Sequence, residues 1–320
     1  MQNPQTARQA HLNPAVVSGL IAKIKSKKEL ANLDNSFCME KINRYLAQNR
    51  KAAKKIGYAG SFRQIERSKE ADALVKSIRS DIRRRYGVFQ TNNLKEAGKL
   101  LDELEKALQD KDIQSDESLE IHKKLLGLHL STKERLDFYP EFFGSIFRIT
   151  GKPNSILDIA SGFNPMAFPY MEINRTNSKD LRFEYDTCEL NKDDADLTSR
   201  YMKIARIRGK AFQLDLTKEM NAGGHTPKII SSFEDDIMFA FKIFDILSTK
   251  QAEAIIKSCR CRWIAASFPI KTISEKMMRF PRRGWFQKML RRLKYKYQTL
   301  VFRNEIVYVF KTEKQGEHDK

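Results

Sequence analysis

Residues Ser155–Pro165 read SILDIASGFNP and are the most informative part of this 320-residue chain. An apolar run leads to Asp158 and then breaks into a turn of small residues, as a buried parallel strand does when it ends at a nucleotide-binding loop. Small residues let the backbone approach a ligand closely, and the start of a following helix offers free N–H groups. A single glycine, Gly162, is a weak signal by itself, and the loop lacks the three-glycine spacing of dehydrogenases.

The composition indicates a folded protein with a polyanionic partner. The chain is 41% hydrophobic, which is enough for a core, and its formal net charge is +19. The charge is clustered: Lys41–Leu100 holds 16 basic and 5 acidic residues, while Arg279–Lys296 holds 8 basic residues, no acidic one and interleaved aromatic residues. A uniformly basic, solvated surface is the simpler interpretation, but two separate basic segments favour nucleic acid bound at several points.

The cysteines and the apolar runs argue against several classes of protein. Four cysteines in a chain of this length do not make a disulfide framework, and Cys259 and Cys261 lack the number and spacing of ligands that a zinc site needs. No apolar run reaches the ~18 residues of a membrane span, and Met1–Pro14 has no signal-peptide core. We therefore expect a cytoplasmic protein without a metal site or a membrane partner.

The helical and strand patterns divide the chain near residue 147. Apolar residues recur at three- and four-residue spacing through Pro14–Phe147, for example in Leu94–Leu108, with a break at Gly87–Thr91. We expect residues 1–147 to form an all-helical, basic domain. We expect residues 148–320 to form a second domain built on an α/β sheet.

From residue 155 onward, short β-rich runs alternate with helical patterns such as Leu197–Arg208 and Lys250–Ser258. This alternation is typical of βαβ units and of a parallel sheet covered on both faces. A closing hairpin across Arg303-Asn304 is similar, by analogy, to the class I (Rossmann-like) methyltransferases, in which antiparallel strands close a doubly wound sheet. The expected strands are Ser155–Ser161, Arg182–Leu190, Ala211–Leu216, Ile237–Phe241, Arg262–Phe268 and Thr299–Phe310.

Each expected strand end is a candidate site, because ligands of open α/β sheets bind beyond the carboxyl ends of the strands. The second strand ends at Glu189, where a carboxylate is placed to accept two hydrogen bonds from a ribose diol; a solvated acid is the simpler alternative. The third strand ends near Asp215, where an acid can accept a hydrogen bond from an exocyclic amine such as that of adenine.

Two lysines follow the fourth and fifth expected strands. Lys242 emerges from an apolar strand and needs a partner or a cavity, because burial of an unpaired charge is costly. Lys271 closes the run Ser267-Phe268-Pro269-Ile270-Lys271 and is expected over the same edge of the sheet.

Together these residues resemble the aminoglycoside-resistance 16S rRNA methyltransferases, which modify N7 of guanine-1405 in the decoding site. The resemblance covers roughly Leu125–Lys311, and the order and spacing of its motifs agree. Ser-Phe-Pro-Ile-Lys and Gly-Phe-Asn-Pro are specific together, while either one alone is not. The matching motifs are Leu128-His129-x-Ser131-Thr132-Lys133-Glu134-Arg135, Leu157-Asp158-x-x-x-Gly162-Phe163-Asn164-Pro165, Phe241-Lys242, Ser267-Phe268-Pro269-Ile270-Lys271 and Asn304-Glu305-Ile306-Val307-Tyr308.

The resemblance implies S-adenosyl-L-methionine as methyl donor, 16S rRNA in the 30S ribosomal subunit as substrate, and a helical N-terminal region that docks on rRNA. A monomer is the default for an enzyme that docks on a ribosome. A role in aminoglycoside resistance is implied by the family alone. The residues implied on the cofactor side are Arg135, the loop residues Asp158, Ala160, Gly162 and Asn164, then Glu189 with Leu190 near the ribose and Asp215 with Leu216 near the adenine. The residues implied on the target-base side, as catalytic candidates, are Lys242, Lys271 and Glu305.

The expected chemistry needs no general base. Guanine N7 is already nucleophilic and loses no proton, so the enzyme must chiefly align N7, the methyl carbon and the sulfur. A carboxylate near the base, with Glu305 as the candidate, stabilises the charge that passes to the product. Two alternatives stay open: methylation of another rRNA or tRNA position, suggested by a longer and more basic N-terminal part, and a non-catalytic ribosome-binding relative, suggested by the single glycine of the first loop.

Overall fold

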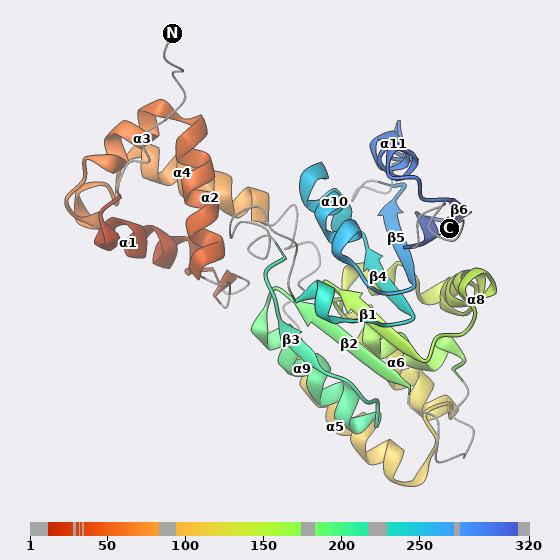
Figure 1. Cartoon of the computed structure of the whole chain (residues 1–320). Coiled ribbons are helices and arrows are strands. Elements are labelled where there is room, and N and C mark those ends of the chain that lie inside the picture. Colours follow the sequence, from red (N-terminus) through yellow and green to blue (C-terminus); the bar gives the residue numbers. More distant parts are fainter. Residues whose placement is uncertain are drawn as a thin grey trace. The chain divides into compact units, whose positions relative to one another are not determined.

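The structure is a computed structural model that describes residues 12–27, 30–31, 33, 35–82, 94–173, 183–216, 229–271 and 276–312. The chain divides into two units, Met1–Gln90 and Thr91–Lys320 (Figure 1). The described part of the first unit is helical, and the second unit contains the sheet.

In the described part of the first unit, four α-helices bury their apolar faces against one another. Leu20 and Ile24 lie four residues apart in α1 and are fully buried, as an amphipathic helix requires. Lys23 of α1 forms an ion pair with Asp72 of α4 at 2.9 Å, which joins the first helix to the last. The elements are α1 (Pro14–Lys25), α2 (Asn35–Gln48), α3 (Arg50–Gly57), the 3-10 turn η2 (Phe62–Gln64) and α4 (Lys69–Ile82).

The second unit is built on a seven-stranded sheet, with the strand order β3-β2-β1-β4-β5-β7-β6 in the described part of the chain. The pairs among β1 to β5 are all parallel, whereas β7 pairs antiparallel with both β5 and β6. The prediction of a doubly wound sheet closed by an antiparallel hairpin is therefore confirmed. The strands are β1 (Ser155–Ile159), β2 (Glu184–Glu189), β3 (Ala211–Gln213), β4 (Ile237–Phe241), β5 (Trp263–Pro269), β6 (Tyr297–Val301) and β7 (Glu305–Lys311).

Helices cover both faces of this sheet (Figure 1). Alternate residues of β1 face opposite sides: Ile156 joins the core with α5, α6, α8 and α9, while Leu157 and Ile159 join the core with α10 and α11. The helices are α5 (Leu94–Asp110), α6 (Asp116–Gly127), α7 (Leu130–Lys133), α8 (Tyr139–Thr150), α9 (Lys192–Ile204), α10 (Thr249–Ser258) and α11 (Gly284–Arg292). The 3-10 turns are η4 (Leu136–Phe138), η5 (Asn164–Met171), η6 (Ile230–Ser232) and η7 (Ile243–Asp245).

The division between the two units differs from the expected boundary at residue 147. We expected α5, α6 and α8 in the N-terminal helical domain, but their apolar residues share one core with a face of the sheet, so the division falls after Gln90. An amphipathic helix has the same periodicity whether it packs on other helices or on a sheet, and the pattern alone does not separate the two cases. The predicted break at Gly87–Thr91 lies outside the described residues.

The segment after the first loop also differs from the expectation of a helix with free N–H groups at its start. It is the 3-10 helix η5, which contains Pro165 and Pro169. Proline has no N–H and disrupts the interior of an α-helix, so this segment does not continue as one. The amide of Asn164 donates to the carbonyl of Ser161 at 3.1 Å, so the loop itself uses the first N–H of the turn.

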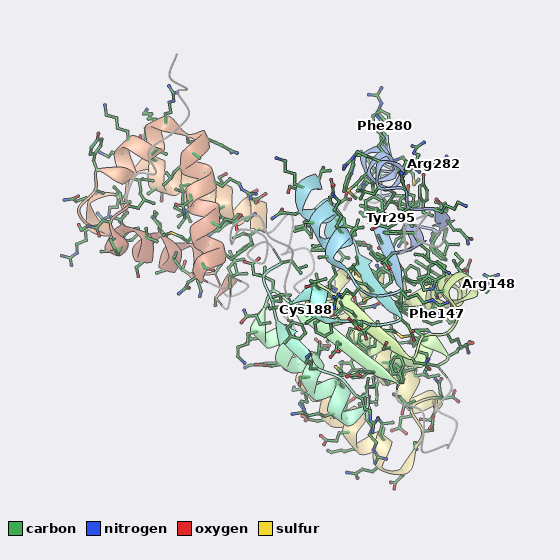
Figure 2. The ribbon with its side chains drawn as sticks, in the orientation of Figure 1. Phe147, Arg148, Cys188, Phe280, Arg282 and Tyr295 are labelled. Atoms are coloured by element: carbon green, nitrogen blue, oxygen red, sulfur yellow. The ribbon has the colours of Figure 1, made fainter. Side chains whose placement is uncertain are left out.

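The described residues contain no helix that is long and apolar enough to cross a membrane. Within the same part of the chain, no group of three or more His, Cys, Asp or Glu side chains is arranged to hold a metal ion. Cys38, Cys188, Cys259 and Cys261 are buried and form no disulfide bond, and Cys188 lies inside the sheet on β2 (Figure 2).

We expect Gly209→Ala to destabilise the second unit. Gly209 has φ +116°, and a Cβ there would stand 2.1 Å from the carbonyl oxygen of Tyr185 in β2. Because both the backbone conformation and the collision oppose a side chain, thermal unfolding should show a loss of about 2–3 kcal/mol. Gly98→Ala is the control: Gly98 lies in α5 with open space around it, and alanine there should be neutral or slightly stabilising. Equal effects of the two substitutions would contradict the close approach at Gly209.

Candidate active site

The sheet topology brings the ends of several strands to one edge. β2, β1 and β4 are neighbours and run parallel, so Glu189, Asp158 and Lys242, near or just after the strand ends, lie along the same edge. β7 runs in the opposite direction, and its first residue, Glu305, pairs with Pro269 at the end of β5. The antiparallel strand therefore adds its amino end to the edge where parallel strands place their carboxyl ends, which is where open α/β sheets bind ligands.

Asp158 is fully buried near the end of β1 and is held by two neighbours. Its Oδ2 accepts hydrogen bonds from Asn164 Nδ2 at 2.7 Å and from the Tyr185 hydroxyl at 2.6 Å. Burial raises the pKa of the Asp158 carboxyl to about 7, although the two hydrogen bonds oppose this shift. Among the residues that the structure describes, no partner reaches Asp158 Oδ1 or Asn164 Oδ1, a rare state for buried polar atoms.

The loop after β1 is closed against β2. The Gly162 N–H donates to Glu189 Oε1, and Ser161 Oγ lies 2.6 Å from Thr187 Oγ1. Ala160 and Gly162 both have positive φ, +52° and +57°. Burial is the main cause that raises the pKa of the Glu189 carboxyl to about 8. The loop therefore presents a tight turn of small residues beside a carboxyl group, as the sequence predicts.

A cluster of four charged side chains connects β4 and β7 to the residues that follow α7. Arg135 and Glu305 are at most 1% exposed and form a bidentate ion pair, with Nε to Oε2 at 3.0 Å and Nη2 to Oε1 at 2.9 Å. Lys242 Nζ lies 3.6 Å from Glu305 and also pairs with Glu134. Although burial raises the pKa of Glu305, the charges of Arg135 and Lys242 outweigh it and hold that pKa below its usual value. We call these four residues the charged cluster.

Aromatic rings fix the guanidinium of the charged cluster. The Arg135 Cζ atom lies 5.0 Å from the centroid of the Phe142 ring and 4.7 Å from that of Phe241. Stacking on rings and bidentate pairing hold the planar guanidinium in one place. Glu305 is 0% exposed, so in this structure its carboxylate is not accessible to the target base that we expected it to contact.

The other predicted residues follow their strands as expected. Leu190 comes after β2, and its carbonyl accepts a hydrogen bond from a side chain of β3 at 2.9 Å. Asp215 and Leu216 come after β3, with Leu216 buried in the core and Asp215 partly exposed. Lys271 lies two residues beyond β5, where its backbone pairs with that of Met277.

Three further residues of the site carry little signal in the sequence. Tyr185 is in the middle of an expected strand, and only the parallel pairing of β1 with β2 places its hydroxyl beside Asp158. Glu134 and His129 belong to the motif that ends at Arg135, and both lie at the site although the sequence singles out only the arginine. The motif as a whole, rather than its last residue, is the signal that could have identified them.

Comparisons with known proteins identify the family to which this chain belongs. The family model for ribosomal RNA methyltransferase (FmrO) matches residues 64–309. The chain belongs to this family. A 16S rRNA (guanine(1405)-N(7))-methyltransferase from Proteus mirabilis is 27% identical over 210 residues, which are 63% of this chain and 69% of that relative. A protein of the same name from Micromonospora echinospora is 25% identical over 252 residues, 73% of this chain and 81% of the relative.

Solved structures share the fold of this ribosomal RNA methyltransferase. The 16S rRNA methyltransferase RmtF, in complex with S-adenosyl-L-homocysteine, matches with a TM-score of 0.66 at 19% identity, over 94% of this chain and 99% of that one. The 16S rRNA methylase RmtB matches with a TM-score of 0.61 at 20% identity, over 94% and 100% of the two chains. These similarities establish the fold, and the chemistry rests on the family and on the residues of the edge.

The residues at the edge of this methyltransferase fit S-adenosylmethionine, the donor that the resemblance implies. This molecule combines a cationic methionine end with a ribose diol and an adenine. Asp158 Oδ1 and Asn164 Oδ1, buried and without a partner among the described residues, suit a donor group such as an ammonium. The carboxyl of Glu189 suits a diol.

We expect Glu305→Gln to destabilise the methyltransferase by about 3–5 kcal/mol, because it leaves the buried guanidinium of Arg135 without its counter-charge. Urea unfolding measures this loss. The control is Glu253→Gln, which breaks ion pairs with Arg292 and Lys257 on the surface and should cost no more than about 1 kcal/mol. If both variants lose the same free energy of unfolding, the Arg135 pair is not a structural requirement.

Proposed function

We propose that this protein transfers the methyl group of S-adenosylmethionine to N7 of a guanine in 16S rRNA, at a position like guanine-1405 in the 30S subunit. The observation that carries the proposal is the edge of the sheet, where a buried carboxyl, a tight loop and a charged cluster converge in a chain of the ribosomal RNA methyltransferase family. The relatives from Proteus mirabilis and Micromonospora echinospora bear that activity in their names. Aminoglycoside resistance is part of the proposal, because the enzymes that the sequence resembles confer it.

The chemistry requires alignment rather than proton removal. Guanine N7 attacks with a lone pair in the plane of the base, and no proton leaves that atom. S-adenosylmethionine, when bound, supplies an electrophilic methyl group on a positively charged sulfur. The protein must hold both reactants in line and exclude water. Asp158, Asn164 and Glu189 bind the donor in this proposal, and the loop backbone around Gly162 lets it approach closely.

In this proposal the charged cluster supports the part of the site that receives the base. Glu305 is buried and bound by Arg135, so it acts by holding Arg135 and Lys242 at the edge rather than by touching the base. Lys242 is held between Glu134 and Glu305, and its residue has the left-handed φ of +61° directly after β4. Lys242 and Lys271 then remain as the groups that orient the target nucleotide.

The first unit offers a surface for RNA on α3. Lys51, Lys54 and Lys55 are exposed there, and together with Tyr58, which is 83% exposed, they line a hollow of about 450 Å³. Lysine ammonium groups bind phosphates, and an exposed aromatic ring offers a base a surface for stacking. This unit therefore docks on folded rRNA by shape and charge, in keeping with how structured RNA is recognised.

A second basic surface lies next to α11 in the second unit. Phe280 is 75% exposed and, with Arg282, projects outward beside the start of this helix (Figure 2). Two surfaces of this kind give the enzyme several phosphate contacts on one large substrate. We propose that it works as a monomer in the cytoplasm, because a docking site on the ribosomal subunit needs no second copy of the chain.

A second candidate function is methylation of another rRNA or tRNA position. The family match begins at residue 64, so α1, α2 and α3 lie outside it. A basic unit with its own surface can direct the same catalytic edge to a different nucleotide.

Methyl transfer from labelled S-adenosylmethionine to 30S subunits and to naked 16S rRNA tests the proposal. We expect label on 30S subunits only, mapped to N7 of guanine-1405, because docking depends on the folded surface of the subunit. Label on another nucleotide would move the function to the second candidate. Absence of label together with absence of donor binding would contradict both and leave a ribosome-binding relative without chemistry.

We expect the double variant Lys54→Glu/Lys55→Glu to bind 30S subunits more weakly. The fall of log affinity with log salt should also become less steep, by about 1 per lysine. The control is Lys106→Glu/Lys124→Glu, which makes the same charge change beside an acidic hollow on α5 and α6. Filter binding over a series of salt concentrations measures both. An equal loss in the two variants would show that total charge, and not the surface of α3, governs docking.

A further inference from the structure

His129 lies between α6 and α7, with its ring against the loop that follows β1. The residue is 8% exposed and forms the N-cap of α7. Its imidazole centroid lies 5.4 Å from that of the Phe163 ring, and the two planes are inclined by 33°. The loop on which the methyl donor is proposed to bind therefore packs against a histidine from a distant part of the sequence.

At Gly162 the His129 ring occupies the space that a side chain would need. A Cβ built on Gly162 would stand 2.7 Å from Cε1 and 2.9 Å from Nε2 of His129, below the 3.0 Å that real Cβ atoms respect. Gly162 also has the positive φ of +57°, which L-residues rarely adopt. The absence of a side chain at Gly162 thus makes room for the imidazole of His129, in addition to letting a ligand approach the loop.

Two features hold the ring in place and keep it neutral. Nδ1 of His129 lies 2.9 Å from Ser131 Oγ. Burial, with a further contribution from the cations Lys242 and Arg135, lowers the pKa of His129 to about 3. An uncharged imidazole packs beside the two cations without repelling them, which a third cation at this position would do.

The same short segment reaches the charged cluster. The carbonyl of His129 accepts hydrogen bonds from the Lys133 N–H and the Thr132 hydroxyl, both at 2.9 Å, so the segment is tied to its own start. α7 covers only four residues, and Arg135 follows close behind it to pair with Glu305. One rigid segment therefore touches the loop at one end and the buried ion pair at the other.

We propose that His129 is a positioning residue: its ring holds the Gly162 turn in the conformation that binds the methionine end of S-adenosylmethionine. The inference rests on the proposed function, because it takes this loop as the site of the donor. His129 acts through the loop, by fixing the Gly162 N–H and its partner Glu189 beside Asp158.

A double-mutant cycle with His129→Ala and Gly162→Ala tests the proposal in the full-length protein. The probe is S-adenosyl-L-homocysteine, with its dissociation constant measured by calorimetry, and unfolding without ligand is measured separately. We expect each single variant to weaken binding by about tenfold or more, since small displacements of a binding group have large effects. The double variant should bind better than the product of the two losses predicts, by about fivefold or more, because removal of the ring relieves the collision.

The matched control is His122→Ala. His122 is fully buried and hydrogen-bonded to Ser118 and to Tyr201 between α6 and α9, so its loss should lower thermal stability and leave the dissociation constant unchanged. Ser131→Ala provides a second test if Gly162→Ala does not fold: it frees the ring without removing it and should weaken binding less than His129→Ala does. With His129→Ala, the KM for S-adenosylmethionine should rise while the KM for the RNA substrate stays unchanged.

The outcomes separate this proposal from the one on which it rests. Wild-type protein without affinity for S-adenosyl-L-homocysteine would contradict the proposed function and the role of His129 together. Wild-type affinity that His129→Ala leaves intact, or losses that simply multiply in the double variant, would overturn the role of His129 alone. A His122→Ala variant that weakens binding as much as His129→Ala would show that stability, and not the loop contact, is responsible.

Discussion

The buried ion pair between Arg135 and Glu305 is the interaction on which the candidate active site depends. Two charges that are at most 1% exposed stay ionised only because each satisfies the other. The partners are 170 residues apart in the chain, so the pair joins the residues that follow α7 to the start of β7. The hairpin of β6 and β7 therefore does more than cover the last parallel strand, since it supplies the carboxylate that a buried guanidinium requires.

The groups on either side of this pair are held by short, specific contacts. On one side, Asp158 is fixed by Asn164 and Tyr185, and on the other, Lys242 is fixed between two carboxylates. Neither arrangement is needed to form the sheet, because apolar residues on both faces of β1, β4 and β5 already provide a core. The edge thus carries polar interactions in addition to a fold that apolar burial stabilises.

Much of the fold follows from the sequence, because strands that are buried on both faces read as short apolar runs with clear ends. Ile237–Phe241 is the same range in prediction and structure, and the hairpin across Arg303-Asn304 is also as expected. The positions of the residues at the edge can then be predicted as well, because the carboxyl ends of parallel strands meet at one side of the sheet. The boundary between the two units cannot be predicted from the sequence pattern, because the periodicity of a helix does not show what the helix packs against. Tyr185 and His129 do not follow either, since their contacts exist only once β2 and α7 are next to the loop.

The charged cluster and the exposed lysines of α3 differ in how they respond to salt. Its two cations and two carboxylates cancel, so the cluster itself is electrically balanced in a chain whose net charge is +19. The electrostatic interactions of the exposed lysines of α3 pass through water and are largely screened beyond about 10 Å at 0.1 M salt. Interactions within a buried, balanced cluster are screened much less. On the proposed function, the balanced cluster therefore adds no net charge that would repel a cationic donor. On the same proposal, a rise in ionic strength releases the RNA while the donor stays bound.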